Sequence, residues 1–152
     1  MRIILVYATY SNSTFLATSI LENELVNTGH EVSLNLVSEV DIEQFKNVDV
    51  VIFTSPSWDN NGAQGLPHQD YDGFREKLGN ITFPGHKFAI MGLGDSTYTY
   101  FCGAVSHLEK MVEKMQGKLV IPSLKIDQYY MFEQERTAEI KKWAAELSAQ
   151  LA

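Results

Sequence analysis

The sequence predicts an α/β fold, a doubly wound parallel sheet of five strands in the order 2-1-3-4-5 with helices on both faces. Apolar runs alternate along the chain with segments of helical periodicity. Residues 3–7, 49–54 and 87–92 are mainly continuous apolar runs, as strands covered on both faces require, whereas residues 32–36 alternate as an edge strand does. The second strand is therefore expected at an edge and the three apolar strands inside.

Four helices are expected between and after these strands, and each carries one apolar stripe. The stripes are Leu16, Ala17, Ile20, Leu21 and Leu25; Tyr71, Phe74 and Leu78; Val105, Leu108, Val112 and Met115; and Ile140, Trp143, Leu147 and Leu151. Gly29 and Gly117 follow the first and third stripes, where helices end. The fifth strand is expected around residues 119–121, with a continuation near 124–126.

Composition narrows the classes of function. A chain of 152 residues suits one domain, residues 1–152, and 19 acidic against 12 basic residues give a net charge of −7. Nucleic acid and anionic membrane are poor partners for such a surface. The single Cys102 excludes an internal disulfide and any multi-cysteine metal site. With no signal peptide or anchor evident, a cytoplasmic location is expected.

The turn after the first strand is rich in hydroxyl side chains and has the residues Thr9, Tyr10, Ser11, Asn12, Ser13 and Thr14. A strand-to-helix turn directs backbone N–H groups to one place at the positive end of a helix dipole, so it can bind an anion. Because no Lys or Arg lies between Arg2 and Lys46, a nucleoside triphosphate loop is excluded. The turn therefore suits a single phosphate held by neutral donors. The alternative is that its Ser and Thr residues only cap the helix.

Three loops meet where the strand order reverses, at residues 8–14, 55–69 and 93–103. Trp58 stands among polar neighbours, which suits a planar ligand, although a ring folded onto its own loop is the alternative. The fourth-strand loop offers Tyr98, Tyr100 and Phe101. A planar ring between aromatic side chains, with a phosphate tail at the first turn, describes flavin mononucleotide (FMN).

Residues 94–103, Gly-Asp-Ser-Thr-Tyr-Thr-Tyr-Phe-Cys-Gly, closely resemble the second flavin-contacting loop of short-chain flavodoxins. The turn at residues 9–14 is similar to their phosphate loop, and Ser57-Trp58 to their first flavin-contacting loop. The resemblance runs the whole chain, and the insertion that splits the fifth strand of long-chain flavodoxins has no room between Leu119 and Asp127.

The resemblance implies a flavodoxin-like fold and a set of FMN-binding residues. Backbone amides of the turn would bind the phosphate, Trp58 and Tyr98 would flank the isoalloxazine, and backbone groups near Asp59, Asn60, Asp95 and Cys102 would meet its polar edge. The expected cofactor-binding residues are Thr9, Tyr10, Ser11, Asn12, Ser13, Thr14, Pro56, Ser57, Trp58, Asp59, Asn60, Gly62, Gly92, Leu93, Gly94, Asp95, Tyr98, Tyr100, Phe101 and Cys102.

Two departures from the family pattern matter. Asn12 stands where the family usually has Gly, and Asn is the next best residue at positive φ. Asp59-Asn60 stands where many flavodoxins have a Gly after the Trp, at a peptide that flips in the family to accept the N5 proton of the semiquinone. A residue other than Gly makes that flip costlier by about 1 kcal/mol, which lowers the expected stability of the semiquinone.

The function expected from this resemblance is a low-potential one-electron carrier that cycles mainly between semiquinone and hydroquinone and has no catalytic residue. Asp59, Asp95 and Asp127 would disfavour the anionic, fully reduced flavin. The expected partners are a reductase, such as ferredoxin/flavodoxin reductase, and acceptor enzymes. Acidic residues near the site would attract these partners electrostatically. The carrier itself is expected to be a monomer.

Two other functions remain open on the sequence. One is an NAD(P)H-dependent flavin or quinone reductase of the same fold. The other is a receiver-like regulatory module without flavin, which would need acidic residues where the first strand ends in Tyr7-Ala8-Thr9. No metal site is expected, since the four histidines lack ligand-like spacing, and of these only His68 lies in the Trp58 loop. Cys102 is expected to be a buried thiol near the ring.

Overall fold

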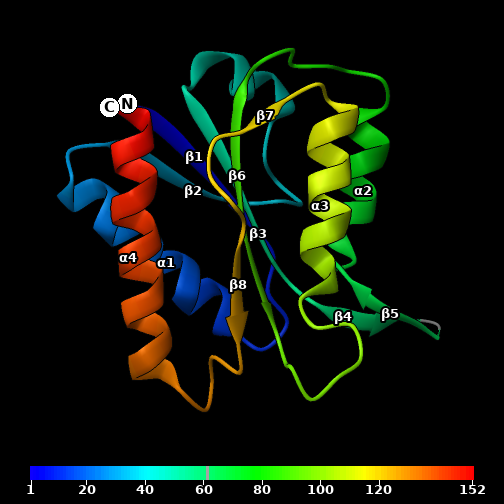
Figure 1. Cartoon of the computed structure of the whole chain (residues 1–152). Coiled ribbons are helices and arrows are strands. Elements are labelled where there is room, and N and C mark those ends of the chain that lie inside the picture. Colours follow the sequence, from blue (N-terminus) through cyan, green and yellow to red (C-terminus); the bar gives the residue numbers. More distant parts are fainter. Residues whose placement is uncertain (61) are drawn as a thin grey trace.

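The structure is a computed structural model that describes residues 1–60 and 62–152. A parallel sheet crosses the molecule, with neighbouring strands in the order β2-β1-β3-β6-β7, and β8 pairs with β6 as well (Figure 1). The strands are β1 (Arg2–Tyr7), β2 (Glu31–Leu36), β3 (Val50–Pro56), β6 (Lys87–Gly94), β7 (Lys118–Leu119) and β8 (Leu124–Asp127). Because β7 and β8 are two pieces of the fifth strand, the predicted order 2-1-3-4-5 is confirmed.

The four predicted helices cover the two faces of the sheet. They are α1 (Ser13–Asn27), α2 (Asp70–Leu78), α3 (Gly103–Lys114) and α4 (Glu133–Leu151). Helices α1 and α4 lie on one face, and α2 and α3 on the other, as Figure 1 shows. A 3₁₀ helix, η1 (Ile42–Asn47), joins β2 to β3.

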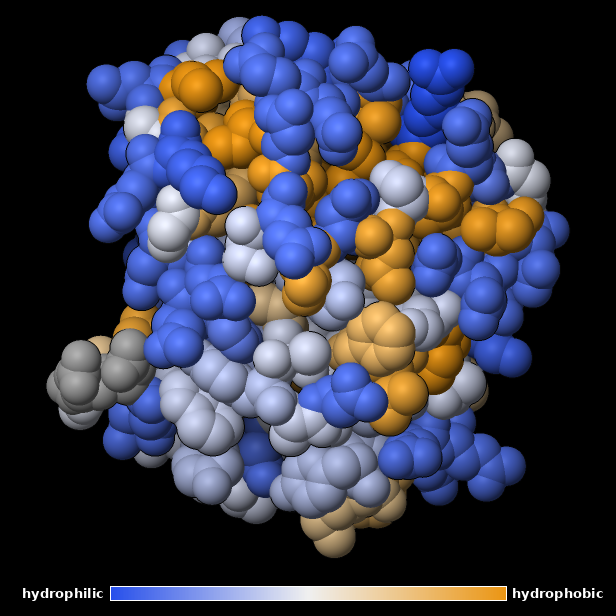
Figure 2. Space-filling model, turned by 180° about the vertical axis from the view of Figure 1, so that it is seen from behind, coloured by the Kyte–Doolittle hydropathy of each residue, from blue (hydrophilic) through white to orange (hydrophobic). Residues whose placement is uncertain are grey.

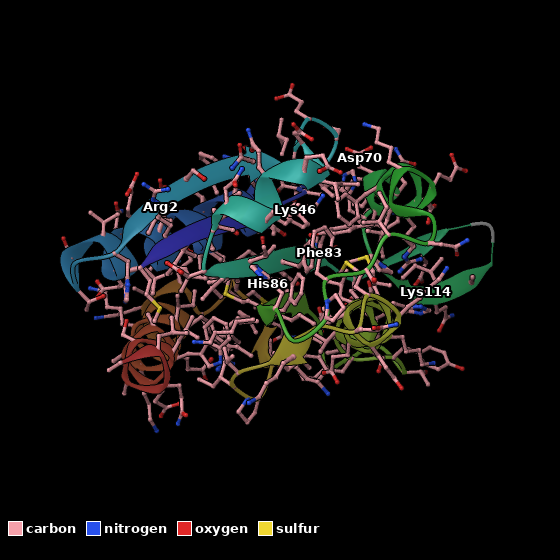
Figure 3. The ribbon with its side chains drawn as sticks, turned by 90° about the horizontal axis from the view of Figure 1, so that it is seen from above. Arg2, Lys46, Asp70, Phe83, His86 and Lys114 are labelled. Carbon is pink, nitrogen blue, oxygen red and sulfur yellow. The ribbon has the colours of Figure 1, made fainter. Side chains whose placement is uncertain are left out.

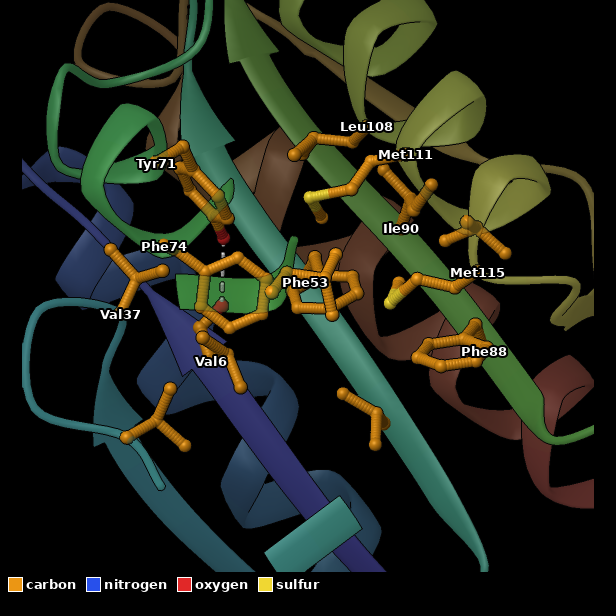
Figure 4. Packing of buried hydrophobic residues seen from close by; sticks show 14 of the residues in the cluster. Val6, Val37, Phe53, Tyr71, Phe74, Phe88, Ile90, Leu108, Met111 and Met115 are labelled. Atoms are coloured by element: carbon orange, nitrogen blue, oxygen red, sulfur yellow. Dashed lines mark hydrogen bonds between the residues drawn. The ribbon is translucent and has the colours of Figure 1, made fainter. Parts of the chain in front are cut away.

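The core on the α2/α3 side is built from aromatic rings. The Phe53 ring of β3 stacks on the Phe88 ring of β6 with centroids 5.7 Å apart and the planes 10° from parallel. The fully buried Tyr71 of α2 points its hydroxyl to the sheet, where it donates to the carbonyls of Val6, at 3.2 Å, and Thr54, at 2.8 Å. Figure 4 shows the bond to Val6 and these packed rings. The phenol joins α2 to β1 and β3, so this helix is fixed directly beside the third-strand loop.

The stripe predicted for α1 is only partly correct. Ala17, Leu21 and Leu25 are buried, but Leu16 is 43% exposed. The inner face also carries Thr18, whose hydroxyl donates to the Thr14 carbonyl at 2.6 Å and lies 2.8 Å from the Thr54 hydroxyl of β3. The buried face of α1 is therefore rotated round the helix relative to the predicted stripe. Near the start of the helix this face is partly polar.

The end of α3 also differs from expectation. Gly29, after α1, adopts the expected positive φ of 94°, but after α3 the left-handed residue is Gln116, with φ 60°, rather than Gly117. Gly117 is required for another reason, because a Cβ there would lie 2.4 Å from the Phe88 ring. Gly117 therefore allows the close approach of the Phe88 ring, and Gln116 adopts the left-handed conformation that ends the helix.

The long loop predicted after β3 contains a hairpin that the sequence did not predict. Strands β4 (Trp58–Asn60) and β5 (Ala63–Leu66) pair antiparallel, with Trp58 opposite Leu66. Figure 1 shows this hairpin projecting at the end of the sheet where the strands finish, beside the start of α3. The described part of the Trp58 loop is therefore built largely from two paired strands.

The two chain ends lie together at the opposite end of the sheet. The Met1 amino group is 3.3 Å from His30 Nδ1, and His30 Nε2 is 3.1 Å from the Ser148 hydroxyl of α4. Figure 3 looks onto this end, where Arg2 begins β1 and His86 precedes β6. Among the described helices, none is long and apolar enough to cross a bilayer.

Candidate functional site

The loops that follow β1, β3 and β6 gather around a cavity of about 390 Å³, and the segment after β8 joins them. This volume is in the range of small-molecule and cofactor sites. Figure 2 shows the loop end of the molecule, at the bottom of the view, covered mostly in pale colours rather than strong blue or orange. Tyrosine, serine and threonine side chains dominate the cavity wall, which suits a ligand with both flat and polar parts.

The first turn has the geometry of an anion site. Helix α1 begins at Ser13, and Asn12 before it is left-handed with φ 72° and ψ −8°, which is the positive φ predicted for it. The Asn12 side chain makes no cap hydrogen bond, and the first N–H groups of any helix lack intrahelical acceptors. These donors can therefore bind an anion in the cavity that Ser11, Ser13 and Thr14 line.

The Thr9 hydroxyl supports the same reading. Its oxygen is buried, yet it has no hydrogen-bond partner among the residues that the structure describes. A buried hydroxyl without a partner costs about 1–3 kcal/mol. The protein itself leaves this hydrogen-bonding group at the turn unsatisfied, although Thr9 does not line the cavity, and with the free N–H groups of α1 the turn fits a phosphate and its attached chain.

Two aromatic rings form walls of the cavity. Trp58 of β4 is 51% exposed and Tyr98 of the loop after β6 is 67% exposed, and both line the cavity. The Trp58 ring lies 4.6 Å from the Tyr10 ring, with the planes 39° apart. The half-exposed Trp58 side chain therefore contacts the turn at residues 9–14, through the Tyr10 ring.

The hairpin is held against α3 by two glycines. A Cβ on Gly103 would lie 2.5 Å from the Gly65 carbonyl oxygen, and a Cβ on Gly65 would lie 2.7 Å from the Tyr100 Cβ. Gly65 also has a positive φ of 68°. The backbones of the two loops therefore touch, which fixes Trp58 and Tyr100 on neighbouring parts of the cavity wall.

The loop after β6 is tied to the end of β8 by hydrogen bonds to two carboxylates. Asp95 accepts from the Thr97 hydroxyl at 2.6 Å, the Thr97 N–H at 2.9 Å, Gln128 Nε2 at 3.0 Å and the Tyr130 hydroxyl at 3.3 Å. The Thr97 side chain contributes most to lowering the pKa of Asp95, followed by the Thr97 backbone N–H and Gln128. Asp127 accepts from the N–H of Ser96 at 2.8 Å and from its hydroxyl at 2.6 Å. Negative charge is therefore fixed beside the cavity.

Cys102 is the buried thiol that the sequence predicted. It precedes α3 with φ 48°, and its Sγ is 3.7 Å from the carbonyls of both Gly92 and Ile126. Burial raises the pKa of this thiol to about 12, so it is protonated at neutral pH. Such a group has no nucleophilic role.

The structure brings most of the predicted site residues to the cavity. Those that line it are Tyr10, Ser11, Ser13, Thr14, Pro56, Ser57, Trp58, Asp59, Leu93, Gly94, Asp95, Tyr98 and Tyr100. Six others are close by in the chain but do not line it: Thr9, Asn12, Gly62, Gly92, Phe101 and Cys102. The side chain of Asn60 lies outside the described part of the chain. Phe101 packs against the core cluster on the α2/α3 side.

Four further residues line the cavity and were not predicted, Gln64, Gly65, Tyr129 and Tyr130. Gln64 and Gly65 reach it because the hairpin folds back, which the sequence did not predict. Tyr129 and Tyr130 follow β8, the second piece of the fifth strand. Because the carboxyl ends of all parallel strands meet at one edge of the sheet, this position after the fifth strand is the sequence signal that indicates them.

Comparison with known proteins identifies the family. The family model for flavodoxin matches residues 5–143. The chain is 35% identical over 127 residues to probable flavodoxin 2 of Bacillus subtilis (strain 168), covering 83% of this chain and 82% of that protein. It is 33% identical over 126 residues to the flavodoxin of Maridesulfovibrio salexigens, covering 82% of this chain and 84% of that protein.

Solved structures show the same fold. Oxidised flavodoxin 2 from Bacillus cereus superposes with a TM-score of 0.87 at 26% identity, over 99% of each chain. The flavodoxin of Fusobacterium nucleatum bound to flavin mononucleotide superposes with a TM-score of 0.82 at 20% identity, over 98% of each chain. The match to the family model and the two relatives at 35% and 33% identity lead to one conclusion: the chain belongs to the flavodoxin family.

Proposed function

We propose that this flavodoxin carries single electrons at low potential, from a reductase such as ferredoxin/flavodoxin reductase to acceptor enzymes, mainly through the semiquinone/hydroquinone couple of its FMN. Flavodoxins are FMN-binding electron carriers and not enzymes, so the reductase and the receiver-like alternatives are set aside. Bound FMN supplies the one-electron chemistry, and the protein sets how tightly it is held and at what potential it works.

The single observation that carries the proposal is an uncapped, cation-free helix start that opens into a cavity walled by Trp58 and Tyr98. The N–H groups of the turn would hold the phosphate, and the unpartnered Thr9 hydroxyl would bind next to it. The two exposed rings would flank the isoalloxazine. In this arrangement the turn binds the phosphate end of FMN and the two exposed rings bind its flat end.

Charge around the cavity supports a low potential. Asp59 and Asp95 line the cavity, and none of the described lining residues is Lys or Arg. The lowered pKa of Asp95 keeps this carboxylate ionised at neutral pH. Adding an electron beside fixed negative charge is unfavourable, and a nearby carboxylate would shift the potential by an amount of the order of tens of millivolts.

The hairpin bears on the stability of the half-reduced flavin. The peptide after Trp58 lies within β4, and Asn60 pairs with Ala63 of β5. The Asp59 carboxylate also accepts a hydrogen bond from the Gly65 N–H at 3.4 Å. A peptide rotation at Asp59-Asn60 would disturb both interactions, so the semiquinone should be less stabilised than in a relative with Gly after the Trp.

The test is a stepwise reduction of the purified holoprotein with dithionite, followed by its visible spectrum. We expect one FMN per chain and a second one-electron potential well below that of free flavin. Potentials for both couples close to the free-flavin values would overturn the low-potential assignment, and failure to bind FMN would overturn the site itself.

A further inference from the structure

His68 occupies an unusual place between the phosphate turn and the Trp58 hairpin. It lies in the segment that joins β5 to α2, and its side chain is only 6% exposed. Its ring stacks on the Tyr10 ring at 3.8 Å, with the planes 22° apart. Trp58 also lies against Tyr10, at 4.6 Å and 39°, so the phenol ring contacts both His68 and Trp58.

A hydrogen bond fixes the tautomer of this imidazole. Its Nδ1 accepts from the Asp70 N–H at 3.0 Å, so in this arrangement the proton is on Nε2. The other contact of the ring is its stacking on Tyr10. The His68 ring thus connects the first residue of α2 to Tyr10 of the turn at residues 9–14.

Backbone contacts reinforce the same connection. The His68 N–H donates to the Ser55 hydroxyl at 2.9 Å, and the Gln69 N–H donates to the Tyr10 hydroxyl at 3.0 Å. Residues 68–70 are therefore attached to β3, to the turn and to the start of α2 at once. We call this set of contacts, made by His68, Gln69, Tyr10 and Ser55, the His68 clasp.

We propose that neutral His68 is a positioning residue that holds Tyr10 behind Trp58 and joins the phosphate turn to the hairpin, so that flavin binds tightly only while the clasp is closed. The inference rests on the proposed FMN site and adds a group that makes no contact with the ligand cavity itself. It predicts that protonation of His68 opens the clasp and weakens flavin binding.

The groups that face His68 set the direction of this effect. The Asp70 carboxylate of α2 lies 3.7 Å from Nδ1, the turn presents the Tyr10 phenol and the Thr9 backbone, and β3 presents the Ser55 hydroxyl. Burial lowers the pKa of His68 from its ordinary 6.5, and this exceeds the opposing effects of Asp70 and of the Thr9 bond. Because the pKa is depressed in the clasped state, the clasp is fully stable above pH 6.5 and is weakened as the pH falls below that value.

A protonated His68 would also lose its bond to the start of α2. The new Nδ1–H would face the Asp70 N–H, so two donors would meet where a donor and an acceptor now pair. The imidazolium Nδ1–H would turn from the Asp70 N–H towards the Asp70 carboxylate, 3.7 Å away, and this rotation would tilt the ring out of its stacked arrangement on Tyr10. Trp58 would then lose the support of a fixed neighbour.

The experiment measures riboflavin and FMN affinity from pH 5 to 8 by quenching of flavin fluorescence. Riboflavin lacks the phosphate, whose own protonation near pH 6 would obscure the result for FMN. The wild-type protein should lose riboflavin affinity several-fold on acidification from pH 7. His68→Phe, which keeps the stacked ring but cannot titrate, should show a flat riboflavin profile, and His107→Gln on α3 should keep the wild-type profile.

A second measurement guards against a variant that folds poorly. The imidazole of His68 is titrated by NMR in the wild-type protein, with and without riboflavin, and its pKa should be lower when riboflavin is bound. A flat wild-type affinity profile, an unchanged pKa, or the same acid loss in His68→Phe would each overturn the proposal. Stoichiometric uptake of FMN at pH 7.5 tests the cofactor site separately, so the two hypotheses fail in distinguishable ways.

Discussion

Gly65 of the hairpin and Gly103 at the start of α3 are in backbone contact, so closely that a Cβ on Gly103 would lie 2.5 Å from the Gly65 carbonyl oxygen. Neither residue contributes a side chain, yet their contact determines where Trp58 and Tyr100 stand. The position of this part of the cavity wall thus depends on the absence of two methyl groups.

Gly103→Ala should displace the hairpin and weaken FMN binding by about tenfold or more, because backbone must move to admit the methyl group. Calorimetric titration of the apoprotein with FMN measures the change. Gly73→Ala on α2 is the matched control, since a Cβ there meets nothing within 4 Å, and it should stabilise the protein by up to about 1 kcal/mol. Unchanged FMN affinity in Gly103→Ala would show that the hairpin position is not critical.

Asn12 provides a test of the phosphate turn. Because its φ is 72°, Asn12→Gly should leave FMN affinity unchanged or raise it, whereas Asn12→Val places a β-branched residue in the left-handed region at a cost of about 1–3 kcal/mol. The dissociation constants for FMN and for riboflavin should be compared, since the loss should be larger for the phosphorylated ligand. An Asn12→Val protein that binds FMN as tightly as the wild type would contradict this geometry.

Thr9→Val should raise the stability of the apoprotein but lower its affinity for FMN. Removal of a buried hydroxyl without a partner should stabilise the apoprotein against urea by an amount of the order of 1 kcal/mol. FMN affinity should fall by a similar amount if the ligand supplies the missing partner. A parallel change in both quantities, in either direction, would mean that Thr9 does not contact the ligand.

Asp95→Asn should raise the second one-electron potential, because it removes a charge that the depressed pKa keeps ionised. In the wild-type protein this carboxylate is protonated only when the pH falls through its lowered pKa, so its effect on the potential should be constant across neutral pH. Thr97→Val is a useful companion, since it removes the hydroxyl donor at 2.6 Å but keeps the charge. A potential that is the same in Asp95→Asn and wild type would remove Asp95 from the electrostatic argument.

Cys102 should be unreactive in the folded protein. Burial raises the pKa of this thiol to about 12, so it is almost entirely protonated at pH 8, and the side chain is also buried. Ellman's reagent should therefore label the native protein far more slowly than the protein in urea. Rapid labelling under native conditions would show that the loop before α3 opens readily.

Much of the fold was accessible from the sequence because its strongest signals are periodic. The bounds of α2, Asp70–Leu78, agree with the stripe of Tyr71, Phe74 and Leu78, and the alternation of β2 placed it at the edge. Leu16 was misplaced because hydroxyl side chains occupy the face of α1 beside β3, and a hydrophobic pattern does not register a paired threonine.

The site residues were predictable where the sequence around the residue carries a signal. They were less predictable where the fold brings separate loops together. Asn12, Trp58 and Tyr98 have local signals, namely a turn, an exposed ring and a recognisable motif. Gln64 and Tyr130 reach the cavity only through the fold of the hairpin and the end of β8. The stacking of His68 on Tyr10 joins residues 58 positions apart in sequence, and no short pattern indicates it.

The chain ends meet at the end of the sheet opposite the cavity, where Met1, His30 and Ser148 form a row of contacts. A short linker could therefore join residue 152 to residue 1 without crossing any loop of the site. A circular permutant of this kind, reopened in a surface turn away from the cavity, would retain every wall of the cavity. The adjacent ends likewise suit this chain to insertion into a loop of a host protein.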